Sequence, residues 1–297
     1  MPALIVALLM LAVGLQAAHS QLPPLQTPEN ASLFYFRAPH AARRAVLGFD
    51  GIAADIYWIR ALQYYGATKL STDPAKRYDD LYPLLDLTTT LDPHFDIAYK
   101  FGAIFLSERF PNGPGRADQA IALLEKGLAA QPHEWEFAQQ IGFVHYWWRN
   151  DYRAAADWFL RAGAMPGAPS WLTPLAAVTL AQGGSRASSR QLWQQVSASA
   201  TEDWLKQQAD QRLRQLDALD RIDALVEAAR RYLARTGALP QTWDDLVRAG
   251  ELQVPPVDPA GYPFVLDPQR AVIRLSPQST LNPLPVEPVR VEQAPAR

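Results

Sequence analysis

The chain of 297 residues contains no cysteine. This absence excludes disulfide bonds, thiolate metal sites, a cysteine nucleophile and a lipidated cysteine. Neither sign of charge is in excess, because 28 Lys and Arg stand against 30 Asp and Glu, for a net charge of −2. The chain therefore has no global positive field, and we expect no nucleic-acid partner. With 48% hydrophobic and 20% charged residues, its composition is that of a folded globular protein.

Charged residues are also missing from the first twenty positions. An apolar run broken by one glycine fills residues 3–15, and Ala18 and Ser20 place small side chains where a signal peptidase would need them. This predicts that residues 1–20 are a secretory signal peptide or, alternatively, an uncleaved anchor with residues 2–18 as a membrane tether. A third alternative is neither, because no basic residue precedes the run. We expect an exported protein, periplasmic or membrane-anchored, with its folded part outside the cytoplasm.

One residue pattern occurs twice in the middle of the chain. The first copy consists of Phe101, Gly102, Ala120, Leu124 and Pro132, and the second of Ile141, Gly142, Ala154, Trp158 and Pro166. Small residues allow two antiparallel helices to approach closely, large apolar residues fill the gap to the next pair, and the proline ends the second helix. The pattern resembles the tetratricopeptide repeat (TPR), a helical hairpin of about 34 residues.

The resemblance implies a mainly α fold, a TPR-like α-solenoid of about four hairpins. A single hairpin cannot bury its apolar face alone, so neighbours must stack. We assign residues 53–200 to the repeats, after a linker and N-terminal segment over 21–52. The hairpins are expected at about 55–94, 95–134, 135–168 and 169–200. An apolar stripe with helical spacing then predicts a capping and connecting helix over 201–236.

The rest of the chain has a different character. Residues 237–281 are expected to form a small α+β unit, with a short helix over 242–250 and a β-hairpin of strands 264–266 and 272–275. The Pro-rich residues 282–297 are expected to be a disordered tail.

This C-terminal unit has a resemblance of its own. The residues that carry it are Tyr232, Thr236, Gly237, Pro240, Asp258, Pro259, Gly261, Pro263 and Phe264. Their order is similar to the soluble head of the major pseudopilin of type II secretion systems, which has a Tyr–Gly–Pro turn and a later DPWGxPY segment. Ala260 stands where that family has Trp, and Phe264 where it has Tyr. The family's methylated Phe and long polymerising helix do not stand upstream, so the resemblance implies an accessory role rather than a pilin subunit.

No catalytic constellation, cofactor motif or metal-ligand spacing is found, and we expect neither an enzyme nor a cofactor. His94 and His133 each follow a repeat-ending proline, and we interpret them as polar turn residues rather than metal ligands. His145 is expected to pack between helices. An enzyme with an unrecognised site is the alternative, and it would require a deep polar pocket with convergent titratable groups.

The candidate functional site is the concave groove that the first helices of TPR hairpins line. By the resemblance, the groove residues are Asp96, Tyr99, Ala103, Leu106, Glu136, Gln139, Phe143 and Tyr146, with Trp147 adjacent and either Trp58 or Ile59 in the first hairpin. Acidic and aromatic side chains suit a peptide or helix that carries apolar anchors and a basic group. The alternative is that these aromatic residues pack against the neighbouring repeats.

The leading hypothesis is thus a non-enzymatic scaffold or adaptor that binds a protein or peptide partner in the bacterial envelope. An accessory component of a type II secretion or type IV pilus-like assembly is the second hypothesis.

Overall fold

The computed structural model describes residues 43–44, 46–268 and 272–287. The predicted signal peptide or anchor, residues 21–42 of the linker and residues 288–297 of the tail lie outside this part of the chain. Within it, no helix combines the length and the apolar character that crossing a membrane requires.

The described chain is mainly helical, and each helix packs against the next one in sequence. The helices are α3 (Asp50–Leu70), α4 (Leu81–Leu91), α5 (Asp96–Ser107), α6 (Ala117–Ala130), α7 (Trp135–Val144), α8 (Tyr152–Gly163), α9 (Leu172–Gln182), α10 (Arg186–Ser199), α11 (Asp203–Thr236) and α12 (Trp243–Arg248), with the π-helical turn η1 (His145–Arg149) after α7. Two short strands follow, β1 (Val265–Asp267) and β2 (Val272–Arg274). The prediction of a mainly helical chain with a small strand hairpin near its C-terminus is confirmed.

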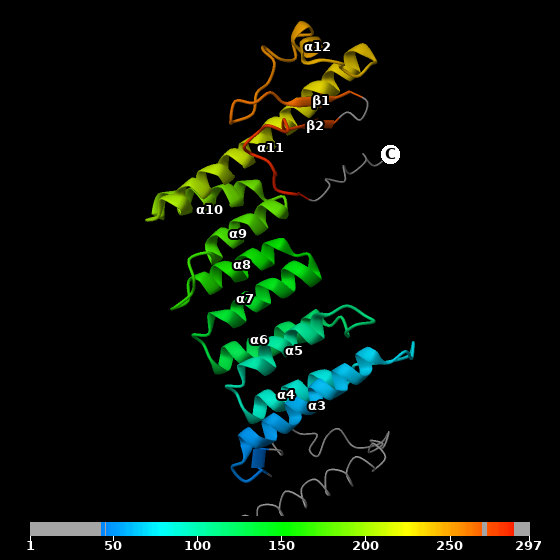
Figure 1. Cartoon of the computed structure of the whole chain (residues 1–297), viewed down its shortest axis with the longest axis vertical. Helices are drawn as coiled ribbons and strands as arrows, with labels where there is room; N and C mark the ends of the chain where they lie inside the picture. Colours follow the sequence, from blue (N-terminus) through cyan, green and yellow to red (C-terminus); the bar gives the residue numbers. More distant parts are fainter. Residues whose placement is uncertain (1–42, 45, 269–271, 288–297) are drawn as a thin grey trace, which may run out of the picture.

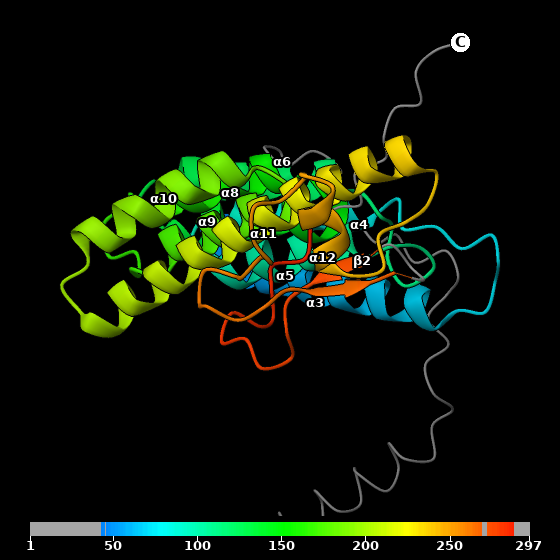
Figure 2. The same ribbon diagram turned by 90° about the horizontal axis from the view of Figure 1, so that it is seen from above.

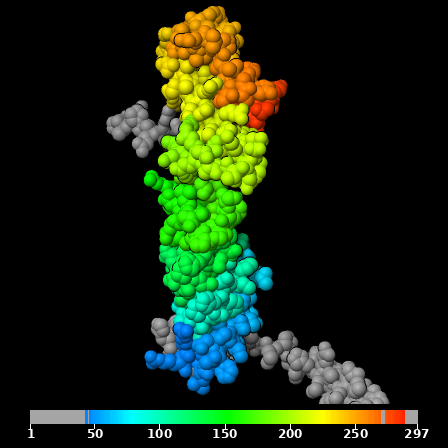
Figure 3. Space-filling model, turned by 90° about the vertical axis from the view of Figure 1, so that its left-hand side faces the viewer, coloured from blue at the N-terminus to red at the C-terminus, as the bar shows by residue number. Residues whose placement is uncertain are grey.

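The helices follow one another along the long axis of an elongated molecule, from α3 at one end to α12 at the other (Figure 1). In the space-filling view, the colours change in sequence order along this axis (Figure 3). Seen along the axis, α6, α8 and α10 lie towards one side and α3 and α5 towards the other (Figure 2). Contacts of α5 with α7 and of α4 with α6 extend along each side. We call α3, α5, α7 and α9 the first helices, and α4, α6, α8 and α10 the second helices.

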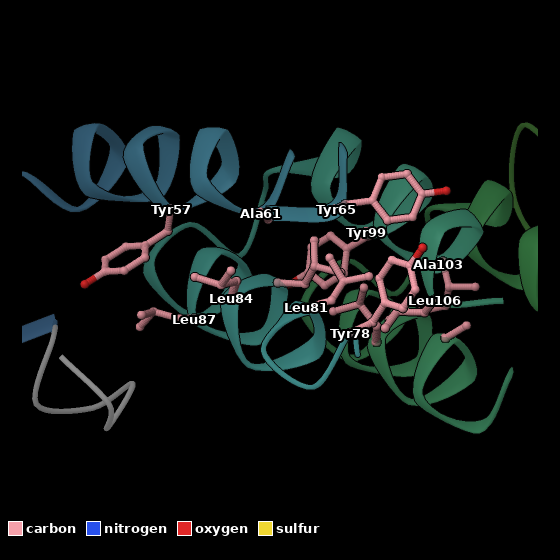
Figure 4. Close-up of a cluster of buried hydrophobic side chains, with 14 of the residues drawn as sticks. Tyr57, Ala61, Tyr65, Tyr78, Leu81, Leu84, Leu87, Tyr99, Ala103 and Leu106 are labelled. Carbon is pink, nitrogen blue, oxygen red and sulfur yellow. The ribbon is translucent and has the colours of Figure 1, made fainter. Parts of the chain in front are cut away.

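The apolar core runs through this stack as a series of local clusters. The first cluster joins α3 to α7 through leucines and tyrosines, including Tyr57, Leu84 and Tyr99 (Figure 4). The second continues from α7 to α10, and the third from α9 to α11. Each helix pair therefore buries its apolar side chains against its sequence neighbours, as expected where one pair alone cannot enclose a core.

The close approach of α7 and α8 takes place at Gly142. A Cβ atom added there would lie 2.5 Å from Cε1 of Phe159 and 3.2 Å from the carbonyl oxygen of Ala155. The expectation of a small residue at this crossing is correct for Gly142. It is wrong by one position on α8, because Ala155 rather than Ala154 is the fully buried small residue; Phe159 is fully buried as well, and the half-buried Trp158 packs against the apolar clusters on both sides. The π-helical turn η1 lies between Gly142 and α8, and such a turn accommodates one additional residue.

Helix α11 links the stack to the C-terminal unit. Leu205 and Ala209 of its first part are buried against α9 and α10. Its later part packs through Ala218 and Leu225 against residues of the C-terminal unit. The helix ends as expected at Gly237, whose φ of 76° is in the left-handed region that favours glycine.

The C-terminal unit consists of α12, the two strands and the loops around them. A capping box between Thr242 and Asp245 begins α12. Strands β1 and β2 pair antiparallel, with Leu266 opposite Ile273. The buried Asp258 carboxylate accepts hydrogen bonds from the backbone N–H groups of Ala260 and Tyr262, at 2.8 and 3.0 Å, and from the Ser279 hydroxyl. This carboxylate therefore fixes the shape of the loop that precedes β1.

Candidate protein-binding surface

Large apolar side chains are exposed on successive first helices. On α5, Ile97, Phe101 and Ile104 are 52%, 50% and 44% exposed, and their spacing of four and three residues places them on one side of the helix. Exposed large apolar side chains also occur on α3 and in η1. We define the first-helix face as Ile59 and Leu62 of α3, Ile97, Phe101 and Ile104 of α5, and Trp147 of η1.

Aromatic contacts beneath this face connect α3 to α5. The ring of Phe101 lies 6.3 Å from that of Phe105, which stacks on Tyr65 at 4.3 Å and on Trp58 at 6.2 Å. Trp58 also contacts Phe95 at 6.0 Å. Trp58 is half-buried in these contacts. Of the two residues predicted for the groove in the first hairpin, Ile59 is therefore the exposed one.

Three of the residues predicted to line a groove on α5 lie in the core instead. Tyr99, Ala103 and Leu106 are at most 1% exposed, and Figure 4 shows them within the apolar cluster. The Tyr99 ring lies 5.3 Å from that of Phe137, and its hydroxyl donates a hydrogen bond to the carbonyl of Thr89 at 3.3 Å. Burial raises the pKa of Tyr99 to about 12. This part of the prediction is wrong, because the side of α5 that faces the second helices is the one assigned to the groove.

Two of the predicted polar residues bond other helices, Asp96 within its own hairpin and Glu136 across to the neighbouring one. Asp96 accepts a hydrogen bond from the Gln131 side chain at 2.7 Å. Glu136 forms an ion pair with Lys100 across the gap between α5 and α7. Gln139 is half-buried on α7. An acidic side chain therefore does lie beside the first-helix face at Glu136, but Lys100 compensates its charge.

The predicted aromatic residues of α7 and η1 divide between core and surface. Phe143 is half-buried with its ring edge-on to Phe159 at 5.1 Å. Tyr146 donates a hydrogen bond to Gln182 of α9 at 2.6 Å, and its ring lies edge-on to Trp147 at 4.8 Å. Trp147 itself is 61% exposed. Phe143 thus belongs to the core, whereas Tyr146 supports Trp147, which presents most of its indole to solvent.

His145 lies in the same π-helical turn. Its Nδ1 is 3.8 Å from the carboxylate of Asp151, and its side chain is largely buried, in agreement with the expectation that it packs between helices. Burial and the neighbouring Arg149 lower its pKa, although Asp151 acts in the opposite direction. The imidazole is therefore held in its neutral form at neutral pH. His94 and His133, in contrast, are exposed in the turns that precede α5 and α7.

Two clusters of titratable groups occupy junctions between helices. At the end of α5, Glu108 accepts hydrogen bonds from Lys69 at 2.8 Å and from the Tyr65 hydroxyl. Burial opposes ionisation of Glu108, but these two hydrogen bonds outweigh it and lower its pKa. Burial and the bond to Glu108 raise the pKa of Tyr65 to about 12. The cluster therefore ties α3 to α5 with charges that are already paired.

The second cluster centres on Arg186 at the start of α10. Its guanidinium bonds Asp220 and Asp223 of α11, at 2.9 and 2.8 Å, and both carboxylate oxygens of Glu287, at 2.5 and 2.6 Å. Arg190 bonds Asp220 as well, at 2.5 Å. The hydrogen bonds that Arg186 donates to Glu287 and to the two aspartates raise its pKa. A polar cavity adjoins this cluster, but its acidic and basic side chains are engaged with one another.

Sequence reasoning missed the exposed residues of α5. Ile97, Phe101 and Ile104 do form an apolar stripe, but Tyr99, Ala103 and Leu106 form another on the opposite side of the same helix. Within the described residues, no group of His, Asp or Glu side chains has the geometry to hold a metal ion. Comparisons of the chain with known protein families, with curated proteins and with solved structures find no match.

Proposed function

We propose that this protein is a non-enzymatic scaffold of the TPR-like α-solenoid type, which binds a protein or peptide partner through the first-helix face. The observation that carries the proposal is the group of exposed apolar side chains on α3, α5 and η1, with Phe101 and Trp147 as its aromatic members. Aromatic residues are typical anchors of protein interfaces because they bury a large area at little conformational cost.

Polar links between hairpins support the assignment to a repeat architecture. Lys100 bonds Glu136 and Tyr146 bonds Gln182 from one hairpin to the next, each across 36 residues, whereas Gln131 bonds Asp96 across 35 residues and closes a single hairpin. These separations are close to the length of one TPR hairpin, about 34 residues. Equivalent contacts between neighbours are what a stack of similar units produces.

The partner's chemistry follows from the face. Its side chains are apolar, and Glu136, the acidic residue predicted for the groove on α7, is paired with Lys100. The face therefore suits an amphipathic helix or an extended segment with two or three apolar anchors, rather than a strongly charged peptide.

Affinity capture with matched variants tests this proposal. Immobilised wild-type protein should retain a specific protein from extracts of the producing cells. Phe101→Ser should reduce the retained amount about tenfold, because losing one aromatic anchor at an interface costs about 2 kcal/mol. Trp204→Ser removes another exposed aromatic residue, on α11 and outside the face, and should leave retention unchanged. Equal loss in both variants, or in neither, would contradict the proposal.

Export to the bacterial envelope is part of the same proposal and is supported by the apolar start of the sequence. Mass spectrometry of the protein recovered from fractionated cells would show a chain that begins at Gln21 if residues 1–20 are a cleaved signal peptide. An intact N-terminus in the membrane fraction would indicate the anchor, and recovery in the cytoplasm would contradict export.

The C-terminal unit favours the second function, an accessory role in a type II secretion or pilus-like assembly. Asp258 organises the loop whose sequence is similar to the pseudopilin signature, and that loop packs beside a long helix, α11. Deletion of the gene should then reduce secretion of a type II substrate or pilus assembly. Undiminished secretion and piliation in the deletion strain would count against this role.

A further inference from the structure

Exposed apolar side chains gather on the first turns of α3 and just before this helix, at the N-terminal end of the stack. Leu47, Phe49, Ile52 and Ile56 are 84%, 66%, 60% and 43% exposed. We call these four residues the end face. Two residues along a helix correspond to about 200° of rotation, so Ile56 points away from Trp58, which contacts α5. Ile52, Ile56 and Ile59 are spaced by four and three residues, so the end face adjoins the first-helix face at Ile59 and continues from it towards the start of α3.

The two ends of the stack differ in how they are covered. At the C-terminal end, α11 lies over α10 and buries Leu205 and Ala209. At the other end, the described residues place only Val46 against the core beside α3. Stacked repeats require an end unit with a polar outer side, or a segment that covers it. The end face has neither within the part of the chain that the structure describes.

We infer that residues 33–36 of this chain dock on the end face and cap the stack. These residues read Leu-Phe-Tyr-Phe and are the only run of four large apolar side chains between residue 21 and α3. Their side chains are aliphatic and aromatic, and side chains of this kind would cover the exposed apolar residues of the end face. They would also remain in the chain after removal of residues 1–20.

The chain length permits this docking. Val46, which is already packed against the core, lies ten positions after Phe36. Ten residues can span up to about 33 Å when extended, and the 21 residues of α3 extend over about 31 Å. Leu47 has a φ of 50°, so the backbone turns sharply just before α3. The segment can therefore reach any point of the outer side of α3 without moving the core.

Disulfide trapping in the full-length chain tests the inference, and the absence of native cysteine provides a clean background. The test variant carries Tyr35→Cys with Ile56→Cys, and the matched control carries Tyr35→Cys with Gln194→Cys, an exposed position on α10. Mild oxidation should produce an internal crosslink in the test variant, visible as a faster-migrating monomer, and none in the control. A disulfide can form only when the two Cα atoms come within about 7 Å.

A second readout remains informative if the pair has poor disulfide geometry. In a chain with Ile56→Cys alone, the thiol should react with a maleimide at least about tenfold faster when Phe34→Ser and Phe36→Ser are added. Dimers linked through position 56 would overturn the inference in favour of a second copy as the occupant. A reaction rate that does not change would overturn it in favour of an end face left open for another protein.

Discussion

Replacing Gly142 with alanine sets two effects of known sign against each other. In a helix interior, Gly→Ala is favourable by about 1 kcal/mol, because alanine loses less backbone entropy on folding. At Gly142, however, the new methyl group would lie 2.5 and 2.6 Å from two carbons of the Phe159 ring. That ring is fully buried, so it can move only by displacing its neighbours.

The steric cost of the added methyl group should outweigh the gain in helix propensity. Forcing a methyl group into a well-packed core costs about 1–3 kcal/mol. The cost at Gly142 belongs at the upper end of this range, because the methyl group would also meet the carbonyl oxygen of Ala155, held in the α8 backbone. We therefore expect Gly142→Ala to lower the free energy of unfolding by about 1–2 kcal/mol, after the gain in helix propensity is subtracted.

Gly66 provides the matched control. It also lies within a helix, α3, but a Cβ atom added there meets nothing within 4 Å. Gly66→Ala should therefore raise the free energy of unfolding by about 0.5–1 kcal/mol. Urea unfolding followed by circular dichroism should move the two midpoints in opposite directions. Stabilisation by both substitutions would refute the close approach of α7 and α8 described above.

Three further predictions concern polar groups. Arg186→Leu should lower the free energy of unfolding by about 1–3 kcal/mol, because it removes the cation that bonds Glu287, Asp223 and Asp220, of which Asp220 keeps its ion pair with Arg190. Proteolysis near residue 287 should become faster. The folded state lowers the pKa of His145, so the unfolded state binds more protons, and stability should fall as pH drops through the unfolded and then the folded pKa. His145→Gln should reduce this slope in thermal unfolding between about pH 7 and 5, whereas His133→Gln at an exposed turn should not. Asp258→Ala should lower the free energy of unfolding by about 2 kcal/mol, because three hydrogen-bond donors lose their buried acceptor. Unchanged hydrogen exchange of the Ala260 and Tyr262 amide protons would contradict the role of this carboxylate.

The helices and their order could be predicted from the sequence because local signals agree with one another. Prolines and polar turns separate the apolar periods, and Gly237 marks the end of α11, where the structure places a left-handed residue. The β-hairpin was also predictable, although β1 and β2 are shorter than expected. These features depend on backbone preferences within a few residues of each position.

The orientation of each helix was harder to predict. Phe101 and Ile141 occupy the same place in the repeated pattern, yet Phe101 is half exposed and Ile141 is fully buried. Helix α5 is apolar on two sides, so its period alone does not show which side faces the second helices. The π-helical turn η1 then shifts the buried residues of α8 by one position, to Ala155 and Phe159. The exposed side of α5 and the buried positions of α8 both depend on tertiary packing, which the repeat pattern does not contain.

Site-specific photo-crosslinking in living cells tests the central claim most directly. A photoreactive amino acid placed at Phe101 or at Trp147 should crosslink the same partner protein, because both positions lie on the first-helix face. The same group at Asp157, exposed on α8, should not crosslink that protein. Ile104→Glu should reduce the crosslinks from both face positions. Equal crosslinking from all three positions, or none from Phe101 and Trp147, would contradict a partner-binding role for this face.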